Sequence, residues 1–371
     1  MPARIAALVV QRSFCGHCVS VVFVMGSDIM AGGFFAVPAM DWFERVPKVE
    51  IHLHLEGAIP HEALWELIQK YGGDPAVPSV ELLKRQFEFR DFAHFIEIWD
   101  WRNRFLREYE DFTFIAEAVA RDLARQNIRY VEAFFSPSDF ARHGLKTQRL
   151  AEAIRAGLSR VPDVHVALVA DLVRDSGPER AAITLSEIHE VRLQGVIGIG
   201  IGGSEQKFPP EMFAGVFEQA RRLGFRTTAH AGEAAGADSV WGAIRSLRVD
   251  RIGHGTRAEE DDSLLEFLAE HHIPLEMCPL SNLRTGMVPS IRKHPIRKYI
   301  DRGLVVTVNT DDPKMFGNSL AGEYRCLEAE LDFSSDDIRA LILQGIRATW
   351  LPKETKEQLS ESFRHDLAWH E

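Results

Sequence analysis

The stretch "KVEIHLHLEGAIP", residues 48–60, places two histidines at alternate positions of an apolar run. Successive side chains of a β-strand point to opposite faces, so His52 and His54 project to the same side. Glu56 follows two positions later. Two imidazoles buried side by side cost free energy unless hydrogen bonds or a bound ligand compensate them. This stretch therefore predicts a strand whose carboxyl end carries a polar site.

Seven similar runs follow, and amphipathic segments of helical period separate most of them. The eight runs are VEIHLH (49–54), RYVEAFFS (129–136), VHVALVAD (164–171), VIGIGIG (196–202), FRTTAH (225–230), DRIGH (250–254), IPLEM (273–277) and LVVTVN (304–309). Apolar strands that alternate with helices indicate a parallel sheet covered on both faces. Eight such units favour an α/β fold of the (β/α)8, or TIM, barrel type. The alternative is an open doubly wound sheet, but no G-x-G-x-x-G motif opens a helix after the first strand.

Composition and charge narrow the class of partner. The chain has 371 residues with a formal net charge of −11, and its basic residues form no conspicuous patch. Nucleic acid and membrane surfaces are therefore not expected as partners, whereas a small molecule is. No apolar run reaches the roughly 18 residues of a membrane span. Four scattered cysteines fit a reducing compartment, so a cytoplasmic location is expected. The oligomeric state stays open.

The first forty residues differ from the rest. Residues 1–40 are apolar but broken by polar positions, and they predict a disordered extension before a single catalytic barrel domain over residues 41–371. The "CGHC" at Cys15–Cys18 resembles a thioredoxin-type motif. That motif requires a βαβ context, which does not follow here, so no redox role is predicted for it.

Reactive side chains gather at the carboxyl ends of the predicted strands, where barrels of this kind carry their chemistry. His230 and Asp311 join His52 and His54 at these ends. Imidazole is the commonest transition-metal ligand among side chains. Three histidines and one carboxylate suit a single Zn²⁺ with water in an open position. The residue types alone leave Fe²⁺, Mn²⁺ and Co²⁺ open.

Three more polar residues then take roles by their chemistry. Glu233, three residues after His230, is placed to act as a general acid. His254 either takes the proton of the attacking water or holds the hydroxide in line. Asp312 is free to bond the substrate. Taken singly, Asp312 also suits a helix cap and Glu233 the first turn of a helix.

Five motifs carry a family resemblance: "KVEIHLHLEGAI", "TAHAGE", "RIGHGT", "CPLSN" and "VTVNTDDP". In this order they resemble the adenosine deaminase family of the amidohydrolase superfamily, from about Lys48 to the last helices. The resemblance implies zinc-dependent hydrolysis at C6 of adenosine or deoxyadenosine, which yields inosine and ammonia. Many members carry Asp where this chain has Glu56. Adenine, or another 6-aminopurine nucleoside such as aminodeoxyfutalosine, is therefore the alternative substrate.

The resemblance also assigns site residues position by position. It implies four zinc ligands: His52, His54, His230 and Asp311. It implies three contacts to the purine: Glu233 at N1, Asp312 at N7 and the Gly203 amide at N3. His254 would position or deprotonate the water, and Glu56 would face the sugar. The segment "GIGIGGSE" lacks the acids of the family's "DLAGDE", and residues 87–101 correspond to the helices that cover the substrate or else serve plain packing.

Other enzyme classes require sequence motifs that can be compared with this chain. A cytidine-deaminase-type enzyme needs H-x-E followed by P-C-x-x-C, but the C-x-x-C here, at Cys15–Cys18, lies upstream. A binuclear amidohydrolase commonly needs a carboxylated lysine at the end of strand four, where "GIGIGG" has none. An inactive relative that only binds a ligand is the alternative of a different class. Measuring turnover of any 6-aminopurine distinguishes an active enzyme from such an inactive relative.

Overall fold

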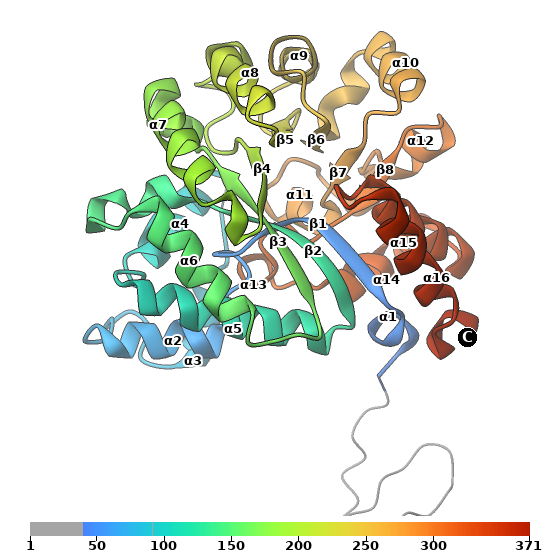
Figure 1. Ribbon diagram of the computed structural model, residues 1–371. Coiled ribbons are helices and arrows are strands. Elements are labelled where there is room, and N and C mark those ends of the chain that lie inside the picture. Colours follow the sequence, from blue (N-terminus) through green and yellow to red (C-terminus); the bar gives the residue numbers. More distant parts are fainter. Residues whose placement is uncertain (1–39, 91) are drawn as a thin grey trace, which may run out of the picture.

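The computed structural model describes residues 40–90 and 92–371. The predicted disordered extension and the Cys15–Cys18 pair lie outside these residues. Eight parallel strands form one sheet in the order β1 to β8 (Figure 1). They are β1 Lys48–His54, β2 Ile128–Phe135, β3 His165–Asp171, β4 Val196–Gly200, β5 Arg226–Ala231, β6 Arg251–His254, β7 Leu275–Met277 and β8 Val306–Val308. Each of the eight predicted strands is present.

The sheet closes on itself between β1 and the residues just after β8. Leu53 and Asp311 form a parallel bridge. The amide of His54 donates to the carbonyl of Asp311 at 2.8 Å, and the amide of Asp311 donates to the carbonyl of His52 at 3.1 Å. The closure confirms the (β/α)8 barrel. It also fixes Asp311 beside the two histidines of β1.

Helices surround the barrel (Figure 1). They are α1 Trp42–Arg45, α2 His61–Lys70, α3 Val80–Arg85, α4 Phe92–Asn103, α5 Tyr109–Arg125, α6 Thr147–Leu158, α7 Gly177–Glu190, α8 Ala214–Arg222, α9 Ala237–Gly242, α10 Asp262–His271, α11 Pro279–Arg284, α12 Ile296–Asp301, α13 Pro313–Phe316, α14 Leu320–Leu331, α15 Ser335–Ala348 and α16 Lys353–Arg364. Four of them, α2 to α5, lie between β1 and β2, where a simple barrel has a single helix.

The helix α15 shows how local sequence produces the covering layer. Ser334 and Asp337 form a capping box, in which each side chain accepts the other residue's backbone N–H. This satisfies two donors that a helix start otherwise leaves unpaired. Ile338, Ile342 and Ile346 follow at intervals of four and are fully buried. They form the apolar face that covers the closing strands β8 and β1.

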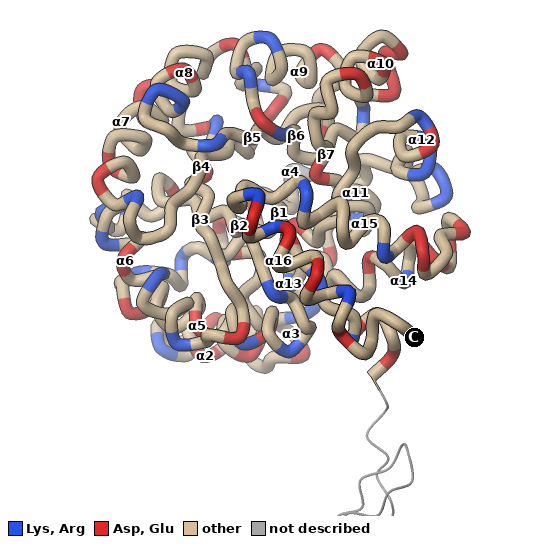
Figure 2. Tube along the Cα trace, turned by 45° about the vertical axis from the view of Figure 1, so that its right-hand side comes forward, with Lys and Arg blue, Asp and Glu red and all other residues tan. Residues whose placement is uncertain are grey.

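The outer surface is polar and mixed in charge. Figure 2 shows acidic and basic residues interspersed along the outer helices. Within residues 40–90 and 92–371, no helix combines the length and apolar character that crossing a bilayer requires.

Candidate active site

A cavity of about 280 Å³ opens at the carboxyl ends of the strands. The predicted site residues that line it are His54, Gly203, His230, Glu233, His254, Asp311 and Asp312. They come from the ends of five different strands, so the fold brings together residues far apart in sequence. His52 lies behind this lining and is fully buried. Glu56 is also buried and is not among the lining residues.

Four donor atoms converge as the predicted metal site requires. The Nε2 atoms of His54 and His230 lie 3.2 Å apart. Asp311 Oδ1 lies 3.4 Å from Nε2 of His54 and 3.6 Å from Nε2 of His52. Ligands about 2.0–2.1 Å from a tetrahedral ion stand about 3.4 Å apart. The Nε2 atom of His52 is buried and forms no hydrogen bond. These residues therefore fit a single transition-metal ion.

The charge distribution also favours a cation here. Burial disfavours charge on His52, yet the neighbouring carboxylates of Asp311 and Glu276 raise its pKa to about 10, so a metal ion bound here would replace a proton on its Nε2. Burial opposes ionisation of Asp311 too, but His52 at 3.6 Å and the surrounding histidines hold the pKa of Asp311 well below its usual range. Burial lowers the pKa of His54 to about 4, which leaves a neutral imidazole with a free lone pair. Neutral imidazole and ionised carboxylate are the ligand forms of these groups.

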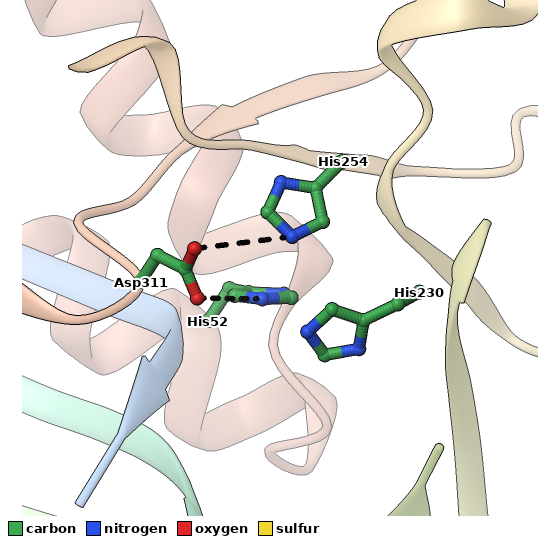
Figure 3. A group of neighbouring side chains, drawn as sticks. All are labelled: His52, His230, His254 and Asp311. Carbon is green, nitrogen blue, oxygen red and sulfur yellow. Dashed lines mark ion pairs between the residues drawn. The ribbon is translucent and has the colours of Figure 1, made fainter. Parts of the chain in front are cut away.

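A second donor group overlaps the predicted one. Figure 3 shows His52, His230, His254 and Asp311 converging, and one ligand atom from each lies within 4.8 Å of the others. His254 Nε2 lies 4.0 Å from Asp311 Oδ2. His54 falls in a separate group with Asp311 and Asp312, so distance alone does not identify His54 rather than His254 as the remaining histidine ligand.

Two of these residues have an unusual backbone conformation. His254 has φ 60° and Asp311 has φ 66°, in the left-handed region that non-glycine residues rarely adopt. Such conformations cost about 1–3 kcal/mol each and cluster at functional sites. Hydrogen bonds hold the Asp311 segment: its main chain pairs with β1, and Ser281 Oγ donates to Asp311 Oδ2 at 2.6 Å. In this backbone conformation both side chains line the cavity.

Glu205 holds the loop that carries Glu233. Its carboxylate accepts backbone N–H groups of Gly232 at 2.6 Å, Glu233 at 3.2 Å, Ala234 at 2.8 Å and Ala235 at 2.9 Å. No role for Glu205 was predicted from the sequence, because only the acids of "DLAGDE" that are absent from "GIGIGGSE" were considered. The final glutamate of that motif is present, and it fixes the position of Glu233.

Burial favours the protonated form of two carboxyl groups, Glu233 and Asp312. Burial, with Asp311 and Glu205 nearby, raises the pKa of Glu233 well above its usual value. Burial and Asp311 do the same for Asp312. Gly57 leaves room for Asp312, because a Cβ at Gly57 would lie 1.7 Å from Asp312 Oδ1. Both acids can therefore donate a hydrogen bond or a proton into the cavity.

A buried network behind His52 was also missed. The Nδ1 atom of His52 lies 2.8 Å from Glu276 Oε2, and Arg251 binds the other oxygen of Glu276. A carboxylate at Nδ1 places the ring proton there and leaves the Nε2 lone pair free for a metal. Arg251 also pairs with Glu132 at 2.6 Å. The one feature of the sequence that could have indicated this network is Glu276, a single glutamate within the apolar strand "IPLEM".

The rest of the cavity lining is aromatic and acidic. Phe95, Ile96 and Trp99 of α4 line it together with Phe316, which agrees with a covering role for this helix. Four lining carboxylates belong to Asp100, Asp139, Asp171 and Asp175. Among the described lining residues none is Lys or Arg. Asp100 is paired with Arg142 at 3.2 Å.

Glu56 faces the protein rather than the cavity. Its Oε1 accepts the backbone N–H of Ser136 at 3.0 Å, and its Oε2 is buried without a hydrogen-bond partner. Burial raises the pKa of Glu56 to about 7. Contact between Glu56 and a sugar stays a prediction. Gly203 does line the cavity, with φ 101°, a conformation that favours glycine.

Comparison with known sequences agrees with this geometry. The sequence profile of the adenosine deaminase family matches residues 47–365. The aminodeoxyfutalosine deaminase of Streptomyces avermitilis is 34% identical over 330 residues, which cover 87% of this chain and 92% of that protein. The adenine deaminase of Acinetobacter baylyi is 32% identical over 320 residues, covering 85% of this chain and 96% of that protein.

Solved structures agree as well. An adenine deaminase from Arthrobacter aurescens has a TM-score of 0.80 and 28% identity, covering 86% of this chain and 98% of that one. An amidohydrolase from Burkholderia ambifaria with bound Zn has a TM-score of 0.80 and 29% identity, covering 87% and 90%. The Arabidopsis protein ADAL complexed with IMP has a TM-score of 0.79 and 26% identity, covering 87% of this chain and 98% of that one. This chain belongs to the adenosine deaminase family.

Proposed function

We propose that the chain hydrolyses the amino group at C6 of a 6-aminopurine that carries no phosphate, with adenine as the preferred substrate. The observation that carries the proposal is the convergence of a histidine and carboxylate donor set and two buried acids, Glu233 and Asp312, on one cavity. The proposal differs from the adenosine deamination expected from the motifs. The relatives described above are named for adenine and aminodeoxyfutalosine.

His52, His54, His230 and Asp311 would hold one divalent metal, and zinc suits them best by ligand type and by the zinc of the Burkholderia relative. When bound, such an ion acts as a Lewis acid that lowers the pKa of a water molecule to about 7. Glu276 serves this set by fixing the ring of His52.

Glu233 supplies the proton that the reaction requires. Addition of water across C6 and N1 places oxygen on C6 and a proton on N1. Ammonia then leaves with the electron pair of the C–N bond and a second proton. Burial raises the pKa of Glu233, which favours the protonated carboxyl group that can donate a proton to N1. Protonated Asp312 can donate a hydrogen bond to N7.

The acidic wall supports a substrate without phosphate. Asp139, Asp171 and Asp175 line the cavity beyond the purine-binding residues. Burial raises the pKa of Asp171 only to about 6, so this carboxylate is ionised at pH 7.5. Placing a phosphate against like charges costs several kcal/mol. The site thus disfavours nucleotides, unlike the Arabidopsis protein ADAL that was solved with IMP.

Aminodeoxyfutalosine is the second candidate substrate. Ile96 and Asp100 of α4 also line the cavity, and we expect a substituent on the purine to lie beside them. The similarity to the Streptomyces enzyme, at 34% identity, points to the same compound. Glu56 offers no oxygen to the cavity lining, so a sugar would bond other groups.

The experiment is ammonia release by zinc-loaded protein, with adenine, aminodeoxyfutalosine, adenosine and AMP assayed side by side. We expect the highest kcat/KM for adenine and a value at least about 100-fold lower for AMP than for adenosine. Metal-stripped protein is the control for background hydrolysis. AMP turnover equal to that of adenosine would refute the phosphate argument. A higher kcat/KM for adenosine than for adenine would restore the original expectation.

A further inference from the structure

A chain of hydrogen bonds leads to His254 and begins at a backbone amide, which can act only as a donor. The N–H of Ile296 donates to Nδ1 of His294 at 3.3 Å. A backbone N–H can only donate, so Nδ1 of His294 carries no proton. His294 is fully buried, and burial lowers its pKa to about 3, so the ring is neutral and its proton lies on Nε2.

The next link fixes the orientation of an amide. Nε2 of His294 lies 3.2 Å from Oδ1 of Asn282. Because this nitrogen carries the proton, it donates and the Asn282 atom must be the oxygen. The hydroxyl of Thr256 donates to the same oxygen at 2.9 Å. The Asn282 amide therefore turns its NH₂ group away from His294.

The last link reaches the site. Nδ2 of Asn282 lies 3.2 Å from Nδ1 of His254. The NH₂ group is a donor only, so Nδ1 of His254 accepts and cannot hold a proton. The proton of the neutral ring then lies on Nε2. This N–H faces two carboxyl oxygens, Glu233 Oε2 at 3.5 Å and Asp311 Oδ2 at 4.0 Å.

We infer that Asn282 and His294 are positioning residues that hold His254 in the Nε2–H form. His254 then donates a hydrogen bond to the oxygen of the attacking water and does not remove its proton. An Nε2–H has no lone pair for a metal, so the histidine that completes the metal-binding set is His54. The catalytic part of this inference rests on the proposed function, whereas the position of the proton does not.

The position of the proton can be measured directly. In zinc-loaded protein labelled with ¹⁵N-histidine, long-range ¹H–¹⁵N spectra distinguish protonated from unprotonated ring nitrogens. The signals of His254 are those that disappear in His254→Gln. We expect Nε2 protonated and Nδ1 unprotonated. The reverse pattern would overturn the inference. Because no substrate is added, a protein with the expected pattern and no deaminase activity would contradict the proposed function alone.

The nearly isosteric substitution Asn282→Asp should move the proton of His254 from Nε2 to Nδ1. In Asn282→Asp the carboxylate still accepts from His294 and Thr256, but it presents an oxygen to Nδ1 of His254, which must then carry a proton. At pH 8.5 we expect the signal of a protonated Nδ1. We also expect kcat to fall by about 10²–10³-fold, the usual loss of one preorganised donor. KM should stay within about threefold. An unprotonated Nδ1 in this variant would overturn the inference.

A matched pair at His294 separates the relay from simple packing. His294→Gln can place an amide N–H where Nε2 donates, whereas His294→Phe fills the space without a donor. We expect His294→Gln to retain the Nε2–H signal of His254 and most of kcat, and His294→Phe to lose both. Equal retention of the Nε2–H signal in the two variants would show that His294 does not set the proton position.

Discussion

Two clusters of buried polar side chains lie in the same barrel and are built differently. In the charge-paired network, Arg251 lies between Glu132 and Glu276, so opposite charges meet. In the histidine cluster, formed by His52, His54, His230 and Asp311, like groups face each other. The charge-paired network balances its charges by ion pairs, although Nη2 of Arg251 and Oε2 of Glu132 form no hydrogen bond. The histidine cluster instead leaves ring nitrogens of three histidines without hydrogen bonds.

The ring nitrogens show the difference most clearly. The Nε2 atom of His52 and the Nδ1 atoms of His54 and His230 are buried without hydrogen bonds. In the charge-paired network, Glu132 also accepts the Tyr130 hydroxyl at 3.0 Å and the Trp350 amide at 2.6 Å. Unpaired buried polar atoms cost about 1–3 kcal/mol each. The barrel thus gives up stability at the histidine cluster, and the four predictions below test this division between function and stability.

Glu233→Gln should give the largest change, and it should be confined to catalysis. The substitution removes the proton donor and no metal ligand, so kcat should fall by about 10²–10⁴-fold. Zinc content and the midpoint of urea unfolding should stay near the wild-type values. Steady-state kinetics with elemental analysis measure both. A variant that turned over normally would show that Glu233 is not the acid.

Arg251→Met should act on stability. It removes the cation between the buried carboxylates of Glu132 and Glu276, and breaking a buried pair in this way costs about 3–5 kcal/mol. Urea unfolding of the metal-free proteins measures this free energy. Arg325→Met is the control, because Arg325 makes only exposed ion pairs and should cost less than about 1 kcal/mol. Equal losses in the two variants would contradict the contrast.

Glu276→Gln tests the contact between the two clusters. Glu276 belongs to the charge-paired network and also bonds Nδ1 of His52. Loss of such an orienting carboxylate typically weakens metal affinity by about 10–100-fold. Competition with a fluorescent zinc chelator measures the affinity. Unchanged zinc affinity would mean that the charge-paired network serves stability alone.

Glu323 should produce a smaller, pH-dependent effect. It accepts from the amide of Leu280 at 3.1 Å and from Asn318 at 2.6 Å, and burial raises its pKa from 4.5 to about 8. The folded protein thus keeps a proton that the unfolded chain releases above pH 4.5. This contribution to stability is complete below pH 4.5 and is lost as pH rises through 8.

The slope from this one proton is at most about 1.4 kcal/mol per pH unit. Urea unfolding at pH 5.5 and 8.5 should show a larger loss of stability for the wild type than for Glu323→Gln. Subtracting the pH dependence of one protein from that of the other removes the contributions that the remaining titrating groups make to the free energy of unfolding. Parallel pH dependences would show that Glu323 does not hold this proton.

The fold was predictable because it repeats a local signal. Each strand is a short apolar run, and its carboxyl end is visible as a change to polar residues such as His54 and Asp311. The rule that barrel chemistry lies at these ends then gathers the site residues without any coordinates. The predicted ligands, Glu233, His254 and Asp312 do converge in the structure.

The supporting contacts were not predictable, because they join side chains that meet only inside the folded barrel. Glu276 meets His52 across 224 positions of sequence. Asn282 lies within the recognised "CPLSN", but its partner His254 comes from the preceding strand unit. The orientation of Glu56 toward Ser136 also depends on how β2 ends beside β1. Local patterns carry no information on such pairings.

The central claim is that the histidine cluster supports hydrolysis at C6 of a 6-aminopurine. The most direct test is turnover of adenine in H₂¹⁸O by metal-stripped protein before and after zinc is restored, followed by mass spectrometry. We predict one ¹⁸O atom in each product molecule and one ammonia released, only after zinc is restored. Absence of labelled product from adenine, aminodeoxyfutalosine and adenosine alike, with zinc bound, would contradict the claim.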